Sequence, residues 1–200
     1  MKYYGQNFED KTILEYFGDF VGTFADIGAN DGITLSNTRA VMERGWKGIC
    51  VEPSPQAFAR LKANVKFFKG VYPYNVAIGN KTGEDMLFES TELLGEGDIG
   101  LVSTFVRAEI ERFSSAVKYL PVTAKVYRWK TFLNRVKYKT FDFISIDCEG
   151  MDLDVLKQIN LTKTRMVCVE WNGHNKQAFI DACPGFRLIA ENGENLIFAR

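Results

Sequence analysis

The sequence predicts an α/β protein with a mostly parallel, seven-stranded sheet that finishes in an antiparallel hairpin. Short apolar segments alternate with helical patterns up to residue 78 and again from residue 141, which is typical of parallel sheets with right-handed crossovers. A turn with glycines at 28 and 32 follows the first apolar segment. Near the end, Asn192-Gly193 joins two apolar runs, and this dipeptide is a strong hairpin signal.

Length and composition indicate one globular domain over residues 1–200. Apolar residues make up 46%, and 25 basic side chains balance 25 acidic ones, so net charge favours no class of partner. No apolar run approaches the roughly 20 residues that span a bilayer. The start, Met-Lys-Tyr-Tyr-Gly, lacks the apolar region of a signal peptide. We therefore expect a cytoplasmic protein without membrane contact.

The four cysteines, at positions 50, 148, 168 and 183, form no CxxC pair and no zinc-ligand spacing. Cys50 and Cys168 lie within strand patterns, so we expect them to be reduced core thiols. The reactivity of Cys148, beside Asp147, stays open at this point.

The first helix is expected over residues 4–17, where Ile13, Leu14 and Phe17 share one helical face. Gln6 and Asp10 lie near its start. Capping of this helix would account for them as polar residues.

The first strand, Val21 to Ile27, runs into the turn Gly28-Ala29-Asn30-Asp31-Gly32, and a helical pattern (Leu35, Thr38, Val41, Met42) follows. Glycines let the backbone approach a ligand there. The GxGxxG spacing of dinucleotide sites is absent, and Asp26 and Asp31 would repel a diphosphate. The two carboxylates suit a ligand with an ammonium and a sulfonium, which describes S-adenosylmethionine.

The second strand, Lys47 to Glu52, places an acid 20 positions beyond Gly32, where a carboxylate accepts hydrogen bonds from ribose hydroxyls. Pro53-Ser54-Pro55 then opens a helix. The third strand is expected over Tyr72 to Ile78, and its end would border the adenine.

The alternation breaks in an insertion of about residues 84–128, which we expect to form a lid over the sheet edge. Asp85 to Glu89, Leu101 to Ser103 and Pro121 to Tyr127 are short strand-like segments around glycines 95, 97 and 100. Between residues 107 and 139, nine basic side chains face two acids, a net charge of +7. This region fits a solvated face, or a docking surface for an acidic glycan or a nucleic acid. Tyr119, Tyr127 and Trp129 suit ring stacking or core packing.

A helix near Lys130 to Val136 leads into the fourth strand, Phe141 to Asp147. The fifth strand is Met166 to Trp171, and a helix from Gln177 to Ala182 follows it. The hairpin is formed by two further segments, Phe186 to Ala190 and Leu196 to Ala199.

Four motifs in this order resemble the FkbM family of S-adenosylmethionine-dependent O-methyltransferases. A Gln-x-x-Glu-Asp opening at residues 6–10 also resembles that family. The motifs are Asp26-Ile27-Gly28-Ala29-Asn30-Asp31-Gly32, Val51-Glu52-Pro53-Ser54, Asn75-Val76-Ala77-Ile78-Gly79 and Ile146-Asp147-Cys148-Glu149-Gly150-Met151-Asp152. The resemblance covers most of the chain and is weakest in the basic insertion. It implies a class I, Rossmann-like methyltransferase fold and methyl transfer to a hydroxyl oxygen, often of a sugar or another secondary metabolite. It does not fix the acceptor.

The resemblance also implies roles for particular residues. The loop from Asp26 to Gly32 would hold the methionine part, Glu52 the ribose, and Asn75 with Ala77 the adenine edge, while Asp147 and Glu149 would lie beside the sulfonium. The expected cofactor-binding set is Gln6, Asp10, Asp26, Gly28, Asn30, Asp31, Gly32, Thr34, Glu52, Pro53, Ser54, Asn75, Val76, Ala77 and Asp147.

Methyl transfer to an alcohol requires a base for the hydroxyl proton. Asp147 and Glu149 are the first candidates, and His174 is chemically apt because an unperturbed imidazole titrates near pH 6.5. Asp147, Glu170 and Asn172 are candidate ligands for a divalent cation that would bind the acceptor hydroxyl, and Glu149 and His174 offer further ligand atoms at the same strand ends. The same acids would also serve as cofactor contacts or helix caps, so metal dependence stays open.

The predicted function is methyl transfer to a hydroxyl of a sugar, a glycan or a related small molecule, which carries an anionic group in one version of the hypothesis. One alternative is an RNA or nucleotide ribose O-methyltransferase that uses the basic insertion. Another is a non-catalytic module that binds S-adenosylmethionine. A nicotinamide-dependent oxidoreductase is disfavoured by the acids in the first loop. The sequence gives no oligomeric state.

Overall fold

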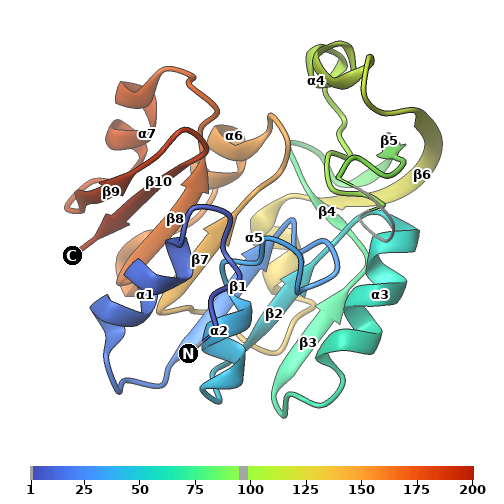
Figure 1. Cartoon of the computed structure of the whole chain (residues 1–200). Helices are drawn as coiled ribbons and strands as arrows, with labels where there is room; N and C mark the ends of the chain where they lie inside the picture. The colour runs from blue at the N-terminus through green and yellow to red at the C-terminus, as the bar shows by residue number, and fades with distance from the viewer. Residues whose placement is uncertain (1, 95–98) are drawn as a thin grey trace.

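The computed structural model describes residues 2–94 and 99–200. Its main sheet has the strand order β3-β2-β1-β7-β8-β10-β9 (Figure 1). Neighbouring strands from β3 to β8 are parallel, whereas β10 pairs antiparallel with both β8 and β9. The expected parallel sheet with a terminal hairpin is therefore confirmed. The strands are β1 (Thr23–Ile27), β2 (Lys47–Val51), β3 (Val71–Tyr74), β7 (Phe143–Ile146), β8 (Met166–Glu170), β9 (Arg187–Glu191) and β10 (Asn195–Ala199).

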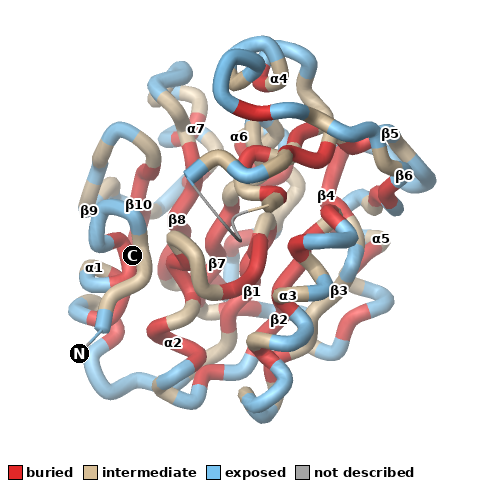
Figure 2. Tube along the Cα trace, turned by 45° about the vertical axis from the view of Figure 1, so that its right-hand side comes forward, coloured by how far each residue is buried: buried red, intermediate tan, exposed pale blue. Residues whose placement is uncertain are grey.

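Helices cover both faces of this sheet, because side chains alternate between two buried clusters along each strand. In β1, Ala25 and Ile27 belong to one cluster and Phe24 to the other. The first cluster includes side chains of α5, α6 and α7, and the second includes those of α1, α2 and α3. Figure 2 shows the strands as a buried centre. The helices are α1 (Glu9–Phe17), α2 (Arg39–Glu43), α3 (Pro55–Val65), α5 (Trp129–Leu133), α6 (Asp152–Leu156), the 3₁₀ helix η1 (Leu161–Lys163) and α7 (Lys176–Ala182).

Two expectations about the first half of the sheet are wrong. The third strand does not run to Ile78: β3 ends at Tyr74, opposite the last residue of β2. Ala77–Ile78 forms a separate strand, β4, in a second sheet. The helix after the first turn also starts later than its apolar pattern suggested, because Leu35 lies in the loop with φ of 54° and α2 begins at Arg39.

The insertion is more regular than its sequence indicated. β5 (Gly83–Ser90) and β6 (Tyr119–Tyr127) pair antiparallel over their length, and β6 also pairs with β4, so that a three-stranded sheet forms. α4 (Arg107–Phe113) lies between β5 and β6 in the chain. Figure 1 shows this unit at the upper right, beyond the main sheet. Gly95 and Gly97 of the predicted glycine-rich loop lie outside the described residues.

The basic residues between 107 and 139 are spread over α4, β6, α5 and the loop after α5. Several have local partners: Arg107 pairs with Glu111, Arg112 with Glu109, and Lys137 donates to the Tyr72 hydroxyl. Trp129 is 3% exposed and packs near Phe132 and Phe141, so its role is core packing.

The remaining expectations concern the cysteines and the membrane. All four cysteines are free, and burial raises the pKa of the Cys148 thiol well above its usual value. This thiol is therefore protonated near neutral pH. No helix within the described ranges combines the length and the apolar content that a bilayer crossing needs.

Candidate functional site

A cavity of about 240 Å³ opens where the carboxyl ends of β1, β2, β7 and β8 meet the insertion and the turn before β10. Such strand ends are where open parallel sheets bind ligands. Thirteen of the residues predicted for the site line this cavity. They are Gln6, Asp26, Gly28, Asn30, Thr34, Glu52, Pro53, Val76, Ala77, Asp147, Glu149, Glu170 and Asn172.

The turn after β1 is shaped by two glycines and by Asp31. Gly28 has a φ of 87° and Gly32 a φ of 72°. Residues other than glycine rarely adopt these backbone conformations. The Asp31 carboxylate accepts hydrogen bonds from the Ile33 and Thr34 amides, at 2.8 and 2.7 Å. Asp31 and Gly32 thus hold the loop in shape without lining the cavity, while Asn30 and Thr34 line it.

Asp26 and Glu52 form the acidic wall of the cavity on the side of β1 and β2. Asp26 accepts a hydrogen bond from the Thr38 hydroxyl, and burial raises its pKa to about 6. The Glu52 carboxylate accepts from the amides of Asn30 and Ser54, at 2.8 and 2.7 Å. Burial, with the charges of Asp26 and Glu89, raises the pKa of Glu52 to about 7. Each Glu52 oxygen keeps a further lone pair for a ligand hydroxyl.

Three predicted cofactor residues hydrogen-bond to backbone groups instead of facing the cavity. Ser54 caps α3 by accepting from the Ala57 amide. The Asn75 side chain donates to the carbonyls of Glu52 and Pro53, at 2.9 and 3.1 Å, and so fixes the turn after β2. Asp10 accepts from the Tyr4 amide. None of these three lines the cavity.

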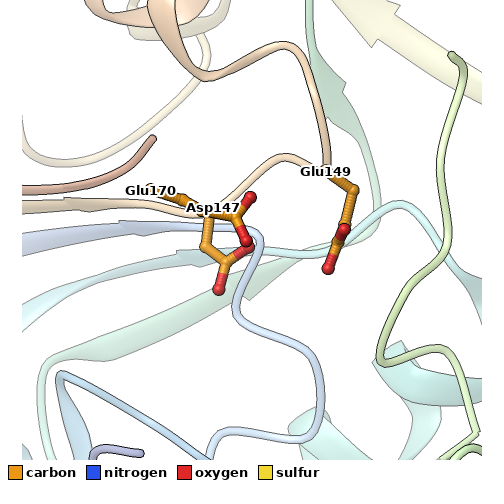
Figure 3. Close-up of side chains that lie close together, drawn as sticks. All are labelled: Asp147, Glu149 and Glu170. Atoms are coloured by element: carbon orange, nitrogen blue, oxygen red, sulfur yellow. The ribbon is translucent and has the colours of Figure 1, made fainter. Parts of the chain in front are cut away.

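Asp147, Glu149 and Glu170 form an acidic cluster that also lines the cavity (Figure 3). One carboxylate oxygen from each lies within 4.8 Å of the others. Asp147 follows β7, Glu170 ends β8, and Glu149 lies on the turn after β7. Burial raises the pKa of each carboxyl well above its ordinary value, and repulsion from neighbouring acids adds to this effect, first from Asp152 for Asp147 and first from Asp147 for Glu149 and Glu170. A cationic ligand would favour the ionised forms of these carboxyls.

Comparison with known proteins assigns this arrangement to a family. A family model described as the Methyltransferase FkbM domain matches residues 26–191, which include every strand end that forms the cavity. The chain belongs to the FkbM methyltransferase family. A curated relative, the 2-O-methyltransferase NoeI of Sinorhizobium fredii (strain NBRC 101917 / NGR234), is 27% identical over 182 residues, which cover 83% of this chain and 72% of that protein.

Solved structures show the same class of fold. The FkbM methyltransferase of Methylobacillus flagellatus KT aligns with a TM-score of 0.53 and 13% identity, over 90% of this chain and 44% of that one. The ribosomal protein L11 methylase of Lactobacillus delbrueckii subsp. bulgaricus aligns with a TM-score of 0.51 and 13% identity, over 96% and 76%. The expected class I methyltransferase fold and S-adenosylmethionine-dependent O-methyltransferase class are confirmed at the level of the family; the acceptor is not identified.

The structure of this chain also brings into the cavity several residues that the sequence did not single out. Asn37 lies before α2, and Glu194 and Asn195 reach the cavity from the hairpin turn. The Asn192-Gly193 turn is visible in the sequence, but its contact with a distant strand end is not. From the insertion, the cavity receives Leu93, Leu94, Gly100, Leu101, Val102, Ser103, Phe105, Arg112 and Phe113.

His174 does not line the cavity. It is exposed on the turn after β8, where its amide donates to the Trp171 carbonyl at 2.7 Å. Asn172, two residues earlier, lines the cavity, and its side-chain hydrogen bond lowers the pKa of Glu170 against the stronger effect of burial. The geometry thus supports the two acids after β7 as base candidates and gives His174 no such support.

Backbone strain is concentrated at the cavity. Within residues 2–94 and 99–200, five residues other than glycine have positive φ. Four of them line the cavity: Asn30, Leu35, Glu149 and Asn172. Non-glycine residues pay about 1 to 3 kcal/mol for such conformations, and these cluster at functional sites.

Proposed function

We propose that this FkbM methyltransferase methylates a hydroxyl group of a sugar, a glycan or a related small molecule, with S-adenosylmethionine bound in the cavity. The observation that carries the proposal is that the acidic cluster lines the same cavity as Asp26 and Glu52. Asp26 and Glu52 suit a cationic nucleoside, and the cluster suits a hydroxyl that must lose its proton. The oxygen named in the relative, a 2-O-methyltransferase, also supports a hydroxyl acceptor.

The unpartnered polar groups of the cavity fit S-adenosylmethionine. Neither side-chain polar atom of Asn30 has a hydrogen-bond partner among the described residues, and neither does the Asn37 amide oxygen. Buried polar atoms of this kind are nearly always satisfied, so they indicate a polar ligand. Asn30, Asn37 and Asp26 would hold the methionine end, Glu52 the ribose hydroxyls, and Pro53, Val76 and Ala77 the adenine.

The residues of the chain would do two things for the reaction. S-adenosylmethionine supplies an electrophilic methyl group on sulfur. Loop and strand ends would align the acceptor oxygen with that methyl, and such orientation contributes about 7 to 11 kcal/mol. Glu149 would accept the hydroxyl proton as the new bond forms, an effect worth roughly 10² to 10⁴-fold. A positive charge beside the acidic cluster would favour the ionised carboxylate that a base needs.

The insertion would bind the acceptor. Phe105, Phe113 and Leu101 give the cavity an apolar rim, and Arg112 adds a positive charge there although it also pairs with Glu109. An apolar rim with one guanidinium fits a ring with a hydrophobic face and an anionic substituent. Of the nine basic residues between 107 and 139, only Arg112 lines the cavity, so a nucleic acid is the weaker candidate.

The test combines ligand identification with an acceptor screen. Mass spectrometry under native conditions should detect S-adenosylmethionine or S-adenosylhomocysteine retained by the purified protein. A screen with S-adenosylmethionine labelled in the methyl group would then compare glycans, nucleosides and RNA. Label that enters only RNA or nucleosides would replace the sugar proposal, and tight binding of NAD without S-adenosylmethionine binding would reject it.

A further inference from the structure

We propose that Asp147, Glu149 and Glu170 bind one divalent cation of the oxygen-preferring kind, such as Mg²⁺, Mn²⁺ or Ca²⁺, at the point where the acceptor hydroxyl binds. The catalytic part of this inference rests on the proposed function, whereas the binding part does not. The site lies at the ends of β7 and β8, where Figure 3 shows the carboxylates of Asp147 and Glu170 side by side.

The spacing of the cluster fits such an ion. One oxygen from each of the three carboxylates lies within 4.8 Å of the others. Hard cations bind oxygen at about 2.0 to 2.6 Å, so two oxygens on one ion are separated by up to about 4 to 5 Å. Three carboxylate oxygens would fill only part of the coordination positions around such an ion. The remaining positions would bind water and the acceptor hydroxyl.

Glu170 has a buried carboxylate oxygen without a hydrogen-bond donor. This residue is 6% exposed, and its Oε2 has no hydrogen-bond partner within the described residues. No salt bridge joins any member of the cluster to a Lys or Arg in the described ranges. A buried carboxylate oxygen without a donor is rare in a folded protein.

S-adenosylmethionine carries a sulfonium, an ammonium and a carboxylate, and thus one net positive charge, whereas the cavity holds the carboxyls of Asp26 and Glu52 and the three of the cluster. A divalent ion binds carboxylate oxygens directly, which a sulfonium with its three carbon substituents does not, so the ion is the better counterion for the cluster.

The chemical role of the ion follows from the coordination positions that the three carboxylates leave free. A hydroxyl bound to a divalent cation becomes more acidic. Its oxygen would form the new bond to the methyl carbon while the bond between that carbon and sulfur breaks, and the electron pair would stay on sulfur to give S-adenosylhomocysteine. Each carboxylate offers one oxygen to the ion, so the second oxygen of Glu149 would accept the hydroxyl proton.

The experiment measures Mn²⁺ binding to the full chain after treatment with EDTA, by calorimetry and by the loss of the free Mn²⁺ EPR signal. We expect one Mn²⁺ per chain, with or without S-adenosylhomocysteine, which lacks the sulfonium. Mg²⁺ or Ca²⁺ should compete. Glu170→Gln should weaken Mn²⁺ binding by at least about tenfold.

The matched control is Glu194→Gln, the same substitution in an acid that lines the cavity outside the cluster. We expect Glu194→Gln to change the affinity much less than Glu170→Gln, with both variants folded by circular dichroism. Absence of stoichiometric binding at millimolar Mn²⁺, or equal effects of the two substitutions, would overturn the metal site. S-adenosylmethionine binding without Mn²⁺ binding would reject the metal and leave the proposed function standing.

Discussion

Gly28 and Asp147 touch through their backbones: a Cβ atom built on Gly28 would lie 1.6 Å from the Asp147 carbonyl oxygen. The turn after β1 therefore packs directly on the end of β7. The turn after β1 would hold the cofactor, and Asp147 at the end of β7 is the first residue of the acidic cluster. Only a residue without a side chain allows the two walls of the cavity to approach so closely.

Gly28→Ala should destabilise the protein by at least about 2 kcal/mol and abolish S-adenosylmethionine binding, because the turn must move away from β7. Thermal unfolding and calorimetry measure both effects. The control is Gly45→Ala, since Gly45 also has a positive φ, of 84°, but a Cβ atom placed on it would meet no atom within 4 Å. Equal losses in the two variants would show that φ alone accounts for the requirement.

The pH dependence of stability should reflect Glu52. Its folded-state pKa of about 7 lies above the ordinary value of 4.5, so the folded state binds this proton more tightly than the unfolded state. The contribution of Glu52 to the free energy of unfolding is therefore present at low pH and is lost as pH rises from about 4.5 to about 7, by roughly 3 kcal/mol. Glu52→Gln should remove this part of the pH profile.

Denaturant unfolding of the ligand-free protein between pH 5 and pH 8 tests this expectation. Asp26, whose pKa is raised to about 6, acts in the same direction, so the informative quantity is the difference between wild type and Glu52→Gln. Glu84→Gln, in an exposed acid of β5, serves as the control. Parallel profiles for wild type and Glu52→Gln would contradict the prediction.

Glu149→Gln should lower kcat by roughly 10² to 10⁴-fold once an acceptor is known, because the amide cannot take the hydroxyl proton. The dissociation constant of S-adenosylmethionine should change little, since the fold of the turn is kept. Asp154→Asn, in an exposed acid of α6, should retain wild-type kcat. A full-rate Glu149→Gln enzyme would transfer the role of base to Asp147.

Glu89→Ala should loosen the insertion. The Glu89 carboxylate of β5 is 2% exposed and accepts hydrogen bonds from the Ser54 hydroxyl and from Gln56 at the start of α3. Its loss leaves the buried Ser54 hydroxyl without this acceptor, a cost of about 1 to 3 kcal/mol. We expect faster proteolysis within the insertion and a higher KM for the acceptor. Glu84→Ala, on the same strand but exposed, should change neither, and resistance of Glu89→Ala to protease would argue against this tether.

The local patterns of the chain predict the fold where partners are close in sequence. Strand and helix alternate through β1, β2 and β3, and the Asn192-Gly193 turn marks the hairpin. The prediction fails at Ala77–Ile78, because these residues continue an apolar pattern but pair with Val126 and Tyr127, which lie about 50 positions away. No local property of residues 72 to 78 identifies that partner.

The residues of the site are likewise predictable from sequence where they stand at strand ends and not where they come from distant loops. Asp26, Glu52 and Asp147 stand at strand ends, so topology alone brings them to one cavity. Asn37, Asn195 and Arg112 arrive from a loop, a hairpin and an insertion, and none of the four family motifs includes them. Asp31 and Asn75 belong to motifs but bond to backbone groups, Asp31 to its own turn and Asn75 to the turn after β2, since short polar side chains serve turn geometry as readily as ligands.

The strained backbone at Asn30, Leu35, Glu149 and Asn172 has a consequence for engineering. Glycine at Leu35 would relieve an unfavourable φ, so thermostabilising substitutions should be found there, on the rim of the cavity. Such gains would release loops whose fixed shape positions the reactants, and proteins commonly trade activity for stability in this way. Directed evolution for heat resistance alone should therefore yield variants that tolerate higher temperature and turn over more slowly.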